Sequence, residues 1–151
     1  MLIRHAHAGT RGRRQDDDRL RPLSKKGWRQ ARALVRALAG VDLRRVLSSP
    51  YVRCVQAVQP LAEARGLQVE ETDDLAEGAG LQPTLRLIRE LAGTPAAMCT
   101  HGDIMFEVCA HLVGLGLIRP DEVRYEKGDA WLLEEKTGEL VAARYLPARS
   151  A

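Results

Sequence analysis

Residues 45–53 have the sequence Arg45-Val46-Leu47-Ser48-Ser49-Pro50-Tyr51-Val52-Arg53, in which a short apolar run changes into the beginning of a helix. The run over 45–48 predicts a buried strand, because it is short, apolar and followed by residues that end strands. Ser49 is a favoured N-cap and Pro50 is favoured at the first helical position, so we expect a helix to begin here and to extend to about Arg65-Gly66. A strand that leads directly into a helix is the repeating unit of α/β folds.

The same alternation continues on both sides of this stretch. Further strands are predicted over 2–3, 67–70 and 96–100, further helices over 25–39, after residue 82 and over 103–114, and a terminal hairpin from 131–133 and 140–143. The polar, glycine-containing segments 6–22 and 72–82 predict loops. We therefore expect an α/β fold, a three-layer sandwich in which a largely parallel central sheet of about five or six strands carries helices on both faces.

The composition is typical of one globular domain over residues 1–151, with 45% hydrophobic and 28% charged residues. No long uncharged apolar run could span a bilayer, and the first residues show no secretory signal, so we expect a cytoplasmic protein that does not contact a membrane. Cys54, Cys99 and Cys109 are widely spaced and include no CxxC pair. Three reduced thiols are therefore expected, and no structural zinc site.

The charge is distributed unevenly along the chain, although the formal net charge is only +3. Residues 1–60 contain 14 Lys/Arg and 4 Asp/Glu, whereas residues 61–151 contain 9 and 16. A basic half that consists mostly of arginine favours an anionic partner: phosphate, a nucleotide or a nucleic acid. A solvated basic face explains the charge alone equally well. The run of Arg11, Arg13, Arg14 and the aspartates 16–18 is expected to be such an exposed segment.

Reactive side chains follow several of the predicted strands. Arg4 and His5 end the first strand, Arg53 lies in the first turn of the helix after the second, Glu77 lies in the loop after the third, and His101 follows the fourth. In α/β sheets, ligands bind outside the carboxyl ends of the strands, so these side chains should converge. Guanidinium groups and a helix N-terminus would bind phosphate, and a neutral imidazole among them can accept a phosphoryl group covalently.

Four segments carry a resemblance to a known family: Arg4-His5-Ala6, Arg21-Pro22-Leu23-Ser24 with Gly27, Ser48-Ser49-Pro50-Tyr51-Val52-Arg53, and Thr100-His101-Gly102. In this order they resemble the motifs of the histidine phosphatase superfamily, and they cover nearly the whole chain. The short first loop and the compact length most resemble the small SixA-type phosphohistidine phosphatases. The resemblance implies a phosphoglycerate-mutase-like fold.

The resemblance also implies roles for individual residues. His5 would be the nucleophile, and Arg4, Arg53 and His101 would hold the phosphoryl group, in a reaction that uses no metal and no cofactor. Larger phosphatases use a glutamate in the loop after the third strand as the acid, which is the place of Glu77, but SixA-type proteins do not clearly keep it. Arg21 would either contact the substrate phosphate or hold the loop.

Three functions remain open at this point. The first is a phosphatase that acts through phospho-His5, of the SixA type, on a phosphohistidine protein. The second is a broad or nucleotide-directed phosphomonoesterase, which acts on small phosphate esters. The third is a silent module that binds phosphate or nucleic acid, and the low aromatic content of 4% together with the lack of a nucleic-acid motif argues against nucleic acid.

Overall fold

The computed structural model describes residues 1–11 and 15–149. The elements follow the chain as β1 (Leu2–Arg4), α1 (Gln15–Leu20), α2 (Lys25–Ala37), β2 (Arg45–Ser48), α3 (Val52–Ala64), β3 (Val69–Glu71), η1 (Asp73–Leu75), α4 (Leu81–Glu90), β4 (Ala96–Thr100), α5 (Gly102–Gly114), η2 (Pro120–Glu122), β5 (Ala130–Lys136) and β6 (Glu139–Leu146). The predicted alternation of strands and helices is confirmed, and β2 and β4 have the predicted bounds.

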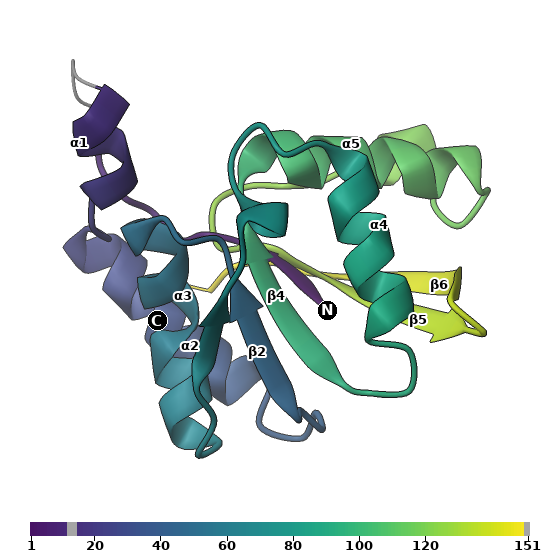
Figure 1. Cartoon of the computed structure of the whole chain (residues 1–151), viewed down its shortest axis with the longest axis horizontal. Helices are drawn as coiled ribbons and strands as arrows, with labels where there is room; N and C mark the ends of the chain where they lie inside the picture. The colour runs from purple at the N-terminus through teal and green to yellow at the C-terminus, as the bar shows by residue number, and fades with distance from the viewer. Residues whose placement is uncertain (12–14, 150–151) are drawn as a thin grey trace.

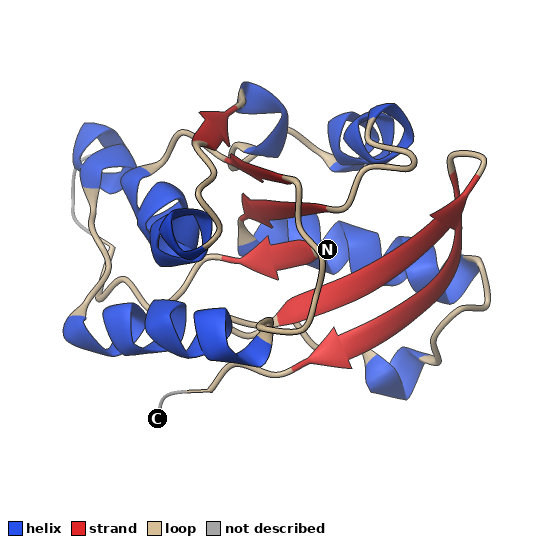
Figure 2. Ribbon diagram, turned by 90° about the horizontal axis from the view of Figure 1, so that it is seen from below, coloured by secondary structure: helices blue, strands red, loops and turns tan. Residues whose placement is uncertain are grey.

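One six-stranded sheet organises the fold, with the strand order β3-β2-β4-β1-β5-β6. The first four strands in this order are parallel, whereas β5 is antiparallel to β1 and β6 is antiparallel to β5. The two longest strands, β5 and β6, form a hairpin along one edge (Figure 2). The prediction of a largely parallel sheet of about five or six strands is therefore confirmed.

Helices cover both faces of the sheet, with α2 and α3 on one side and α4 and α5 on the other (Figure 1). Successive strand residues alternate between the two layers, as the pleat requires. Ile3 and Val46 pack in the apolar cluster that includes residues of α2 and α3, whereas Leu2 and Leu47 pack in the cluster that includes residues of α4 and α5. The central strand β4 is buried at every position, which is typical of a strand covered on both faces.

The parallel register brings the carboxyl ends of three strands together. Arg4 of β1 is paired with Thr100 of β4, and Ser48 of β2 is paired with Cys99. The next residue of each chain segment therefore leaves the sheet at the same edge. This edge places His5, Ser49 and His101 side by side.

The segment 6–22 contains a short helix, α1, that the sequence did not predict. The backbone N–H of Arg21 donates to the carbonyl of Asp18, and the Arg21 side chain is paired with the Asp18 carboxylate, which together close the end of this helix. Residues 13 and 14 and the side chains of 16 and 17 lie outside the described residues. The prediction of an exposed charged segment is wrong at Asp18, which is 4% exposed.

Helix α3 begins at Val52, two residues later than predicted, and its N-cap is Tyr51 rather than Ser49. The backbone N–H of Ser49 donates to the carbonyl of Cys99 (2.9 Å), so the chain continues along the sheet for one more residue. The Ser49 hydroxyl contacts His101 and is not free to cap the helix in the usual way. The third strand begins at Val69 instead of 67, and the loop after it contains the turn η1.

No helix in the described part of the chain is both long and apolar enough to cross a membrane.

Candidate active site

A cavity of about 460 Å³ lies where β1, β2 and β4 end. All six residues predicted for the site line it, namely Arg4, His5, Arg21, Arg53, Glu77 and His101, together with Gly9, Arg11, Gly102, Asp103, Phe106, Tyr125 and Lys127. Among these described lining residues, arginine and lysine outnumber aspartate and glutamate. The cavity therefore favours an anionic ligand.

His5 is held in one tautomer by the backbone. Its Nδ1 lies 2.8 Å from the carbonyl oxygen of Ala6, and since a carbonyl only accepts, Nδ1 carries the proton. Nε2 is therefore unprotonated, and its lone pair accepts a hydrogen bond from Nε of Arg53 at 3.3 Å. Burial lowers the pKa of His5 to about 3. The hydrogen bond to Ala6 acts in the opposite direction, whereas Arg53, His101 and Arg4 lower the pKa further. The imidazole is therefore neutral at neutral pH.

Arg53 is almost completely buried, although it lies in the first turn of α3. Its Nη1 donates to the carbonyl of Asp18 (2.6 Å) and its Nη2 to the Asp18 carboxylate (3.2 Å). The guanidinium carbon also lies 4.9 Å from the centre of the Tyr51 ring. These contacts fix the arginine fork beneath the cavity before any ligand binds.

Asp18 is a site residue that the sequence interpretation missed. Besides Arg53, it accepts two hydrogen bonds from Arg21, through Nε (3.1 Å) and Nη2 (2.9 Å). Burial would raise the pKa of Asp18, but the hydrogen bonds from Arg21 and the charges of Arg53 and Arg11 hold it below the ordinary aspartate value. The carboxylate thus positions two cavity arginines. The spacing of Asp18 and Arg21 by three residues was the only local signal.

His101 occupies the N-cap position of α5, so the cavity lies at the N-terminus of this helix. Its Nδ1 lies 3.4 Å from Nη2 of Arg53, which can only donate, so Nε2 carries the proton and donates to Oγ of Ser49 (2.8 Å). The rings of His5 and His101 lie 5.5 Å apart, centre to centre. Ser49, which the sequence interpretation treated only as a cap, therefore orients His101.

Arg4 is held between two backbone segments. Its Nη1 donates to the carbonyl of Tyr125 (2.7 Å), and its Nε is buried without a hydrogen-bond partner in the described part of the protein. The guanidinium packs directly on Gly102, where a Cβ would lie only 2.7 Å from the guanidinium carbon. A side chain at the position after His101 would therefore displace the Arg4 guanidinium. Arg4 lines the cavity, so its guanidinium charge acts on an anion bound there.

Glu77 lies over the cavity, as its place in the loop predicted. Its Oε1 accepts from Nη2 of Arg11 (2.7 Å), and its Oε2 lies 3.7 Å from Nη2 of Arg53. The loop is fixed further by the N–H of Gly78, which donates to the Asp103 carboxylate (2.8 Å). Both carboxylate oxygens of Glu77 are therefore engaged by arginines.

Arg21 lines the cavity but directs its hydrogen bonds to the first loop. Besides Asp18, it contacts the carbonyl of Ala8, to which Nη1 donates at 2.8 Å. Of the two predicted alternatives, these contacts favour holding the loop.

No group of three or more His, Cys, Asp or Glu that could hold a metal ion occurs among the described residues. Cys54, Cys99 and Cys109 are buried as free thiols, and Cys54 Sγ lies 3.5 Å from Nε2 of His101.

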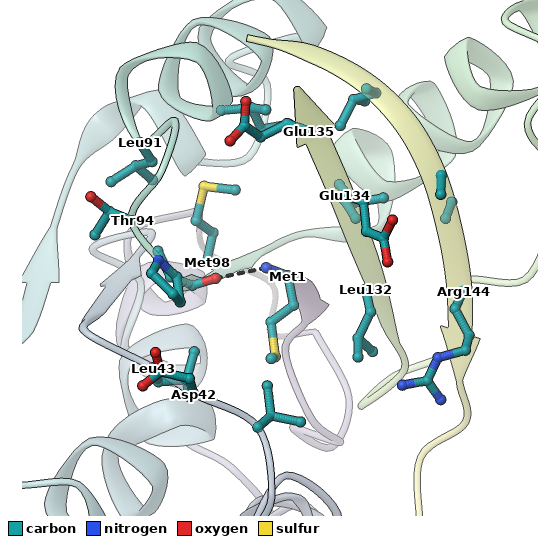
Figure 3. A pocket seen from close by; sticks show the side chains of 18 of the residues that line it. Met1, Asp42, Leu43, Leu91, Thr94, Met98, Leu132, Glu134, Glu135 and Arg144 are labelled. Atoms are coloured by element: carbon teal, nitrogen blue, oxygen red, sulfur yellow. Dashed lines mark hydrogen bonds between the residues drawn. The ribbon is translucent and has the colours of Figure 1, made fainter. Parts of the chain in front are cut away.

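A larger cavity, of about 530 Å³, lies where the parallel strands begin, at the other end from the histidine cavity. Figure 3 shows the side chains that line it. Its centre is the N-terminus, where the Met1 amino group donates to the carbonyl of Ala96 (2.6 Å). The charged side chains at this cavity are three carboxylates, Asp42, Glu134 and Glu135, and Arg144. This charge disfavours a phosphate, so the histidine cavity is the candidate active site.

Known proteins resemble this chain in sequence and in fold. The sequence model of the histidine phosphatase superfamily (branch 1) matches residues 1–82. The 8-oxo-(d)GTP phosphatase of Mycolicibacterium smegmatis is 33% identical over 151 residues, which cover 97% of this chain and 47% of that protein. The chain thus spans about half the length of this curated relative.

Two solved structures have the same fold. A SixA protein from Agrobacterium tumefaciens superposes with a TM-score of 0.78 at 22% identity, over 97% of this chain and 96% of that one. The protein histidine phosphatase SixA in complex with tungstate superposes with a TM-score of 0.73 at 18% identity, over 99% of this chain and 94% of that one. The predicted phosphoglycerate-mutase-like, SixA-like architecture is confirmed.

Proposed function

The chain belongs to the histidine phosphatase superfamily, and on this basis we propose that it transfers the phosphoryl group of a substrate to Nε2 of His5 and then hydrolyses the phosphohistidine. The tautomer of His5 is the observation that carries this proposal. Because the Ala6 carbonyl takes the Nδ1 proton, Nε2 keeps its lone pair at the cavity, and the lowered pKa keeps the ring neutral. A neutral, oriented imidazole is the form that attacks phosphorus.

The surrounding cations stabilise the transferred group. Charge in the transition state spreads over the three equatorial oxygens of the phosphoryl group, and preorganised donors there lower the barrier. Arg53 is fixed by Asp18 and Arg4 by the Tyr125 carbonyl, so these two donors need little rearrangement. His101 must turn its N–H from Ser49 to donate to the phosphoryl group. A silent phosphate-binding module would not need a histidine in a single, neutral tautomer.

The contacts of Glu77 restrict which leaving groups the site can accept. A general acid must bring a carboxyl oxygen to the leaving group, but Oε1 of Glu77 is paired with Arg11 and Oε2 lies 3.7 Å from Arg53. We therefore propose a substrate whose leaving group departs without a protein acid. Two classes meet this condition: a phosphohistidine protein, whose imidazole departs readily, and a nucleotide phosphoanhydride, whose leaving group is itself a phosphate. The SixA-like fold is compatible with the first, and the 8-oxo-(d)GTP phosphatase relative favours the second.

The direct test is a substrate panel of phosphohistidine protein, nucleoside diphosphate, aryl phosphate and sugar phosphate, with the His5→Ala protein as the blank. We expect turnover of the activated substrates and poor turnover of the sugar phosphate. Glu77→Gln should change kcat/KM for the aryl and the sugar phosphate by similar, small factors. A loss of about 10²–10⁴-fold confined to the sugar phosphate would instead show that Glu77 is a general acid.

A further inference from the structure

Phe106 is the only phenylalanine in the sequence, and it is not in the core. It is 52% exposed and lines the phosphate cavity. Phenylalanine is one of the residues most often buried in folded proteins. An exposed aromatic ring at the wall of a site is therefore a candidate for ligand contact.

The position of Phe106 follows from α5. Gly102 and Asp103 at the beginning of this helix also line the cavity, and Phe106 follows them by four and three residues, which places it on the same helix face. Its ring lies 5.8 Å from the ring of Tyr125, edge to face. Tyr125 in turn holds Arg4 through its carbonyl. The aromatic pair is thus connected directly to the phosphate-binding arginine.

The reacting phosphoryl group and the part of the ligand that contacts Phe106 would lie at different depths in the cavity. His5, Arg53 and His101 are at most 5% exposed, whereas Phe106 is half exposed at the mouth. A cavity of about 460 Å³ is within the range of small-molecule sites, about 300–1,000 Å³. A flat group on Phe106 would therefore be several bonds away from the phosphorus at His5. The imidazole of a phosphohistidine is bonded directly to phosphorus and would not extend to the mouth.

The cations that line the cavity favour a ligand with more than one phosphate. Lys127 lines the cavity two residues after Tyr125. Burial lowers the pKa of Lys127, and the charges of Arg4, Arg21 and Arg53 act in the same direction. A further cation among arginines is stabilised by an additional anion. A nucleoside diphosphate or triphosphate supplies this anion and a planar base in one molecule.

We propose that Phe106 and Tyr125 form a base-binding wall, and that the substrate is a nucleoside diphosphate or triphosphate. This inference rests on the proposed function. Nε2 of His5 bonds to the terminal phosphorus while the bond from that phosphorus to the bridging oxygen breaks, and the electron pair leaves with the shortened nucleotide as an anion. Water then attacks the phosphorus and the P–N bond breaks, with its electron pair returning to Nε2 of His5. The water oxygen and its two protons leave with inorganic phosphate, which releases protons to solvent according to the pH.

The test compares GDP, CDP and inorganic pyrophosphate, which share the anhydride but differ in the base. For the wild type we expect kcat/KM to decrease from GDP to CDP to pyrophosphate, because a larger base stacks over more area. In Phe106→Ala the ratio of GDP to pyrophosphate should fall by about 5- to 150-fold, the range for stacking of one base on an aromatic side chain. Phe106→Tyr should restore most of the ratio.

Leu115→Ala is the matched control, because Leu115 is 47% exposed at the end of the same helix and does not line the cavity. It should leave the ratio unchanged. The inference is overturned if the ratio is the same in Phe106→Ala and the wild type, or if phosphohistidine protein is preferred over every nucleotide. In both cases phosphorylation of His5 by an aryl phosphate would still support the proposed function, whereas full activity of His5→Ala would contradict that function itself.

Discussion

Replacing Gly102 with alanine tests whether the position of Arg4 matters for activity. The new Cβ would lie 2.7 Å from the guanidinium carbon of Arg4 and 2.8 Å from Nη2. Carbon atoms in contact prefer about 3.5–4.0 Å, so the guanidinium must move by about 1 Å. A misplacement of about 1 Å in a catalytic site can reduce the rate by about 10²-fold. We expect Gly102→Ala to lower kcat/KM by this factor.

The variant should stay folded, with a loss of at most about 3 kcal/mol in the free energy of unfolding. The displaced group is the end of a flexible side chain, and its charged hydrogen bond to the Tyr125 carbonyl contributes about 1.5–3 kcal/mol. Alanine in place of glycine gains up to about 1 kcal/mol in a helix interior and less at its first residue, so it offsets only part of that loss. Activity and stability are therefore predicted to separate.

The assay is kcat/KM for an aryl phosphate, measured together with thermal unfolding. Gly114→Ala is the matched control, because Gly114 ends the same helix and a Cβ there meets no atom within 4 Å. It should keep wild-type activity and gain up to about 1 kcal/mol in stability. Full activity in Gly102→Ala would refute the reasoning, as would unfolding of that variant.

Three further predictions concern charge. Asp18→Asn should lower kcat/KM and reduce the free energy of unfolding by about 1.5–3 kcal/mol at pH 7 in urea titration, because Arg53 and Arg21 lose a charged acceptor. The pKa of Asp18 is lowered in the folded protein, so the difference in stability between Asp18→Asn and the wild type should disappear as the pH falls through that lowered pKa. A difference that stays constant with pH would contradict the ion pairs assigned to Asp18. Because burial lowers the pKa of His5 to about 3, its ring resonances should not titrate by NMR between pH 8 and pH 5. In the unfolded chain His5 takes up a proton below about pH 6.5, so the free energy of unfolding should decrease as the pH falls below that value. A titration of His5 near pH 6.5 would show an exposed ring. Activity should survive exhaustive chelation, since arginine and lysine outnumber carboxylates among the described cavity residues, and recovery of lost activity on adding Mg²⁺ or Zn²⁺ would contradict the mechanism.

The convergence of Arg4, His5 and His101 could be predicted because it depends only on strand order. Each lies at or directly after the end of a parallel strand, and parallel strands end at one edge of a sheet. Arg53 could be placed for the same reason, through the helix that follows β2. These positions need no knowledge of side-chain packing.

The role of Asp18 could not be predicted, because a run of aspartates has the same sequence whether it is solvated or buried. Its partner Arg53 is 35 residues away, and the pairing depends on how α1 folds back over α3. The close contact of Gly102 with Arg4 was also hidden, since it joins residues at the ends of two neighbouring strands. Both features arise from tertiary packing, to which local patterns are insensitive.

The most direct test of the central claim is to trap the intermediate. The enzyme is mixed with a ³²P-labelled activated substrate, quenched within the first turnover in base, and digested for mass spectrometry. The structure predicts acid-labile, base-stable label on Nε2 of His5, because Nδ1 is bonded to the Ala6 carbonyl. Label on His101 or on Nδ1 of His5, or turnover without any labelled histidine, would contradict this mechanism.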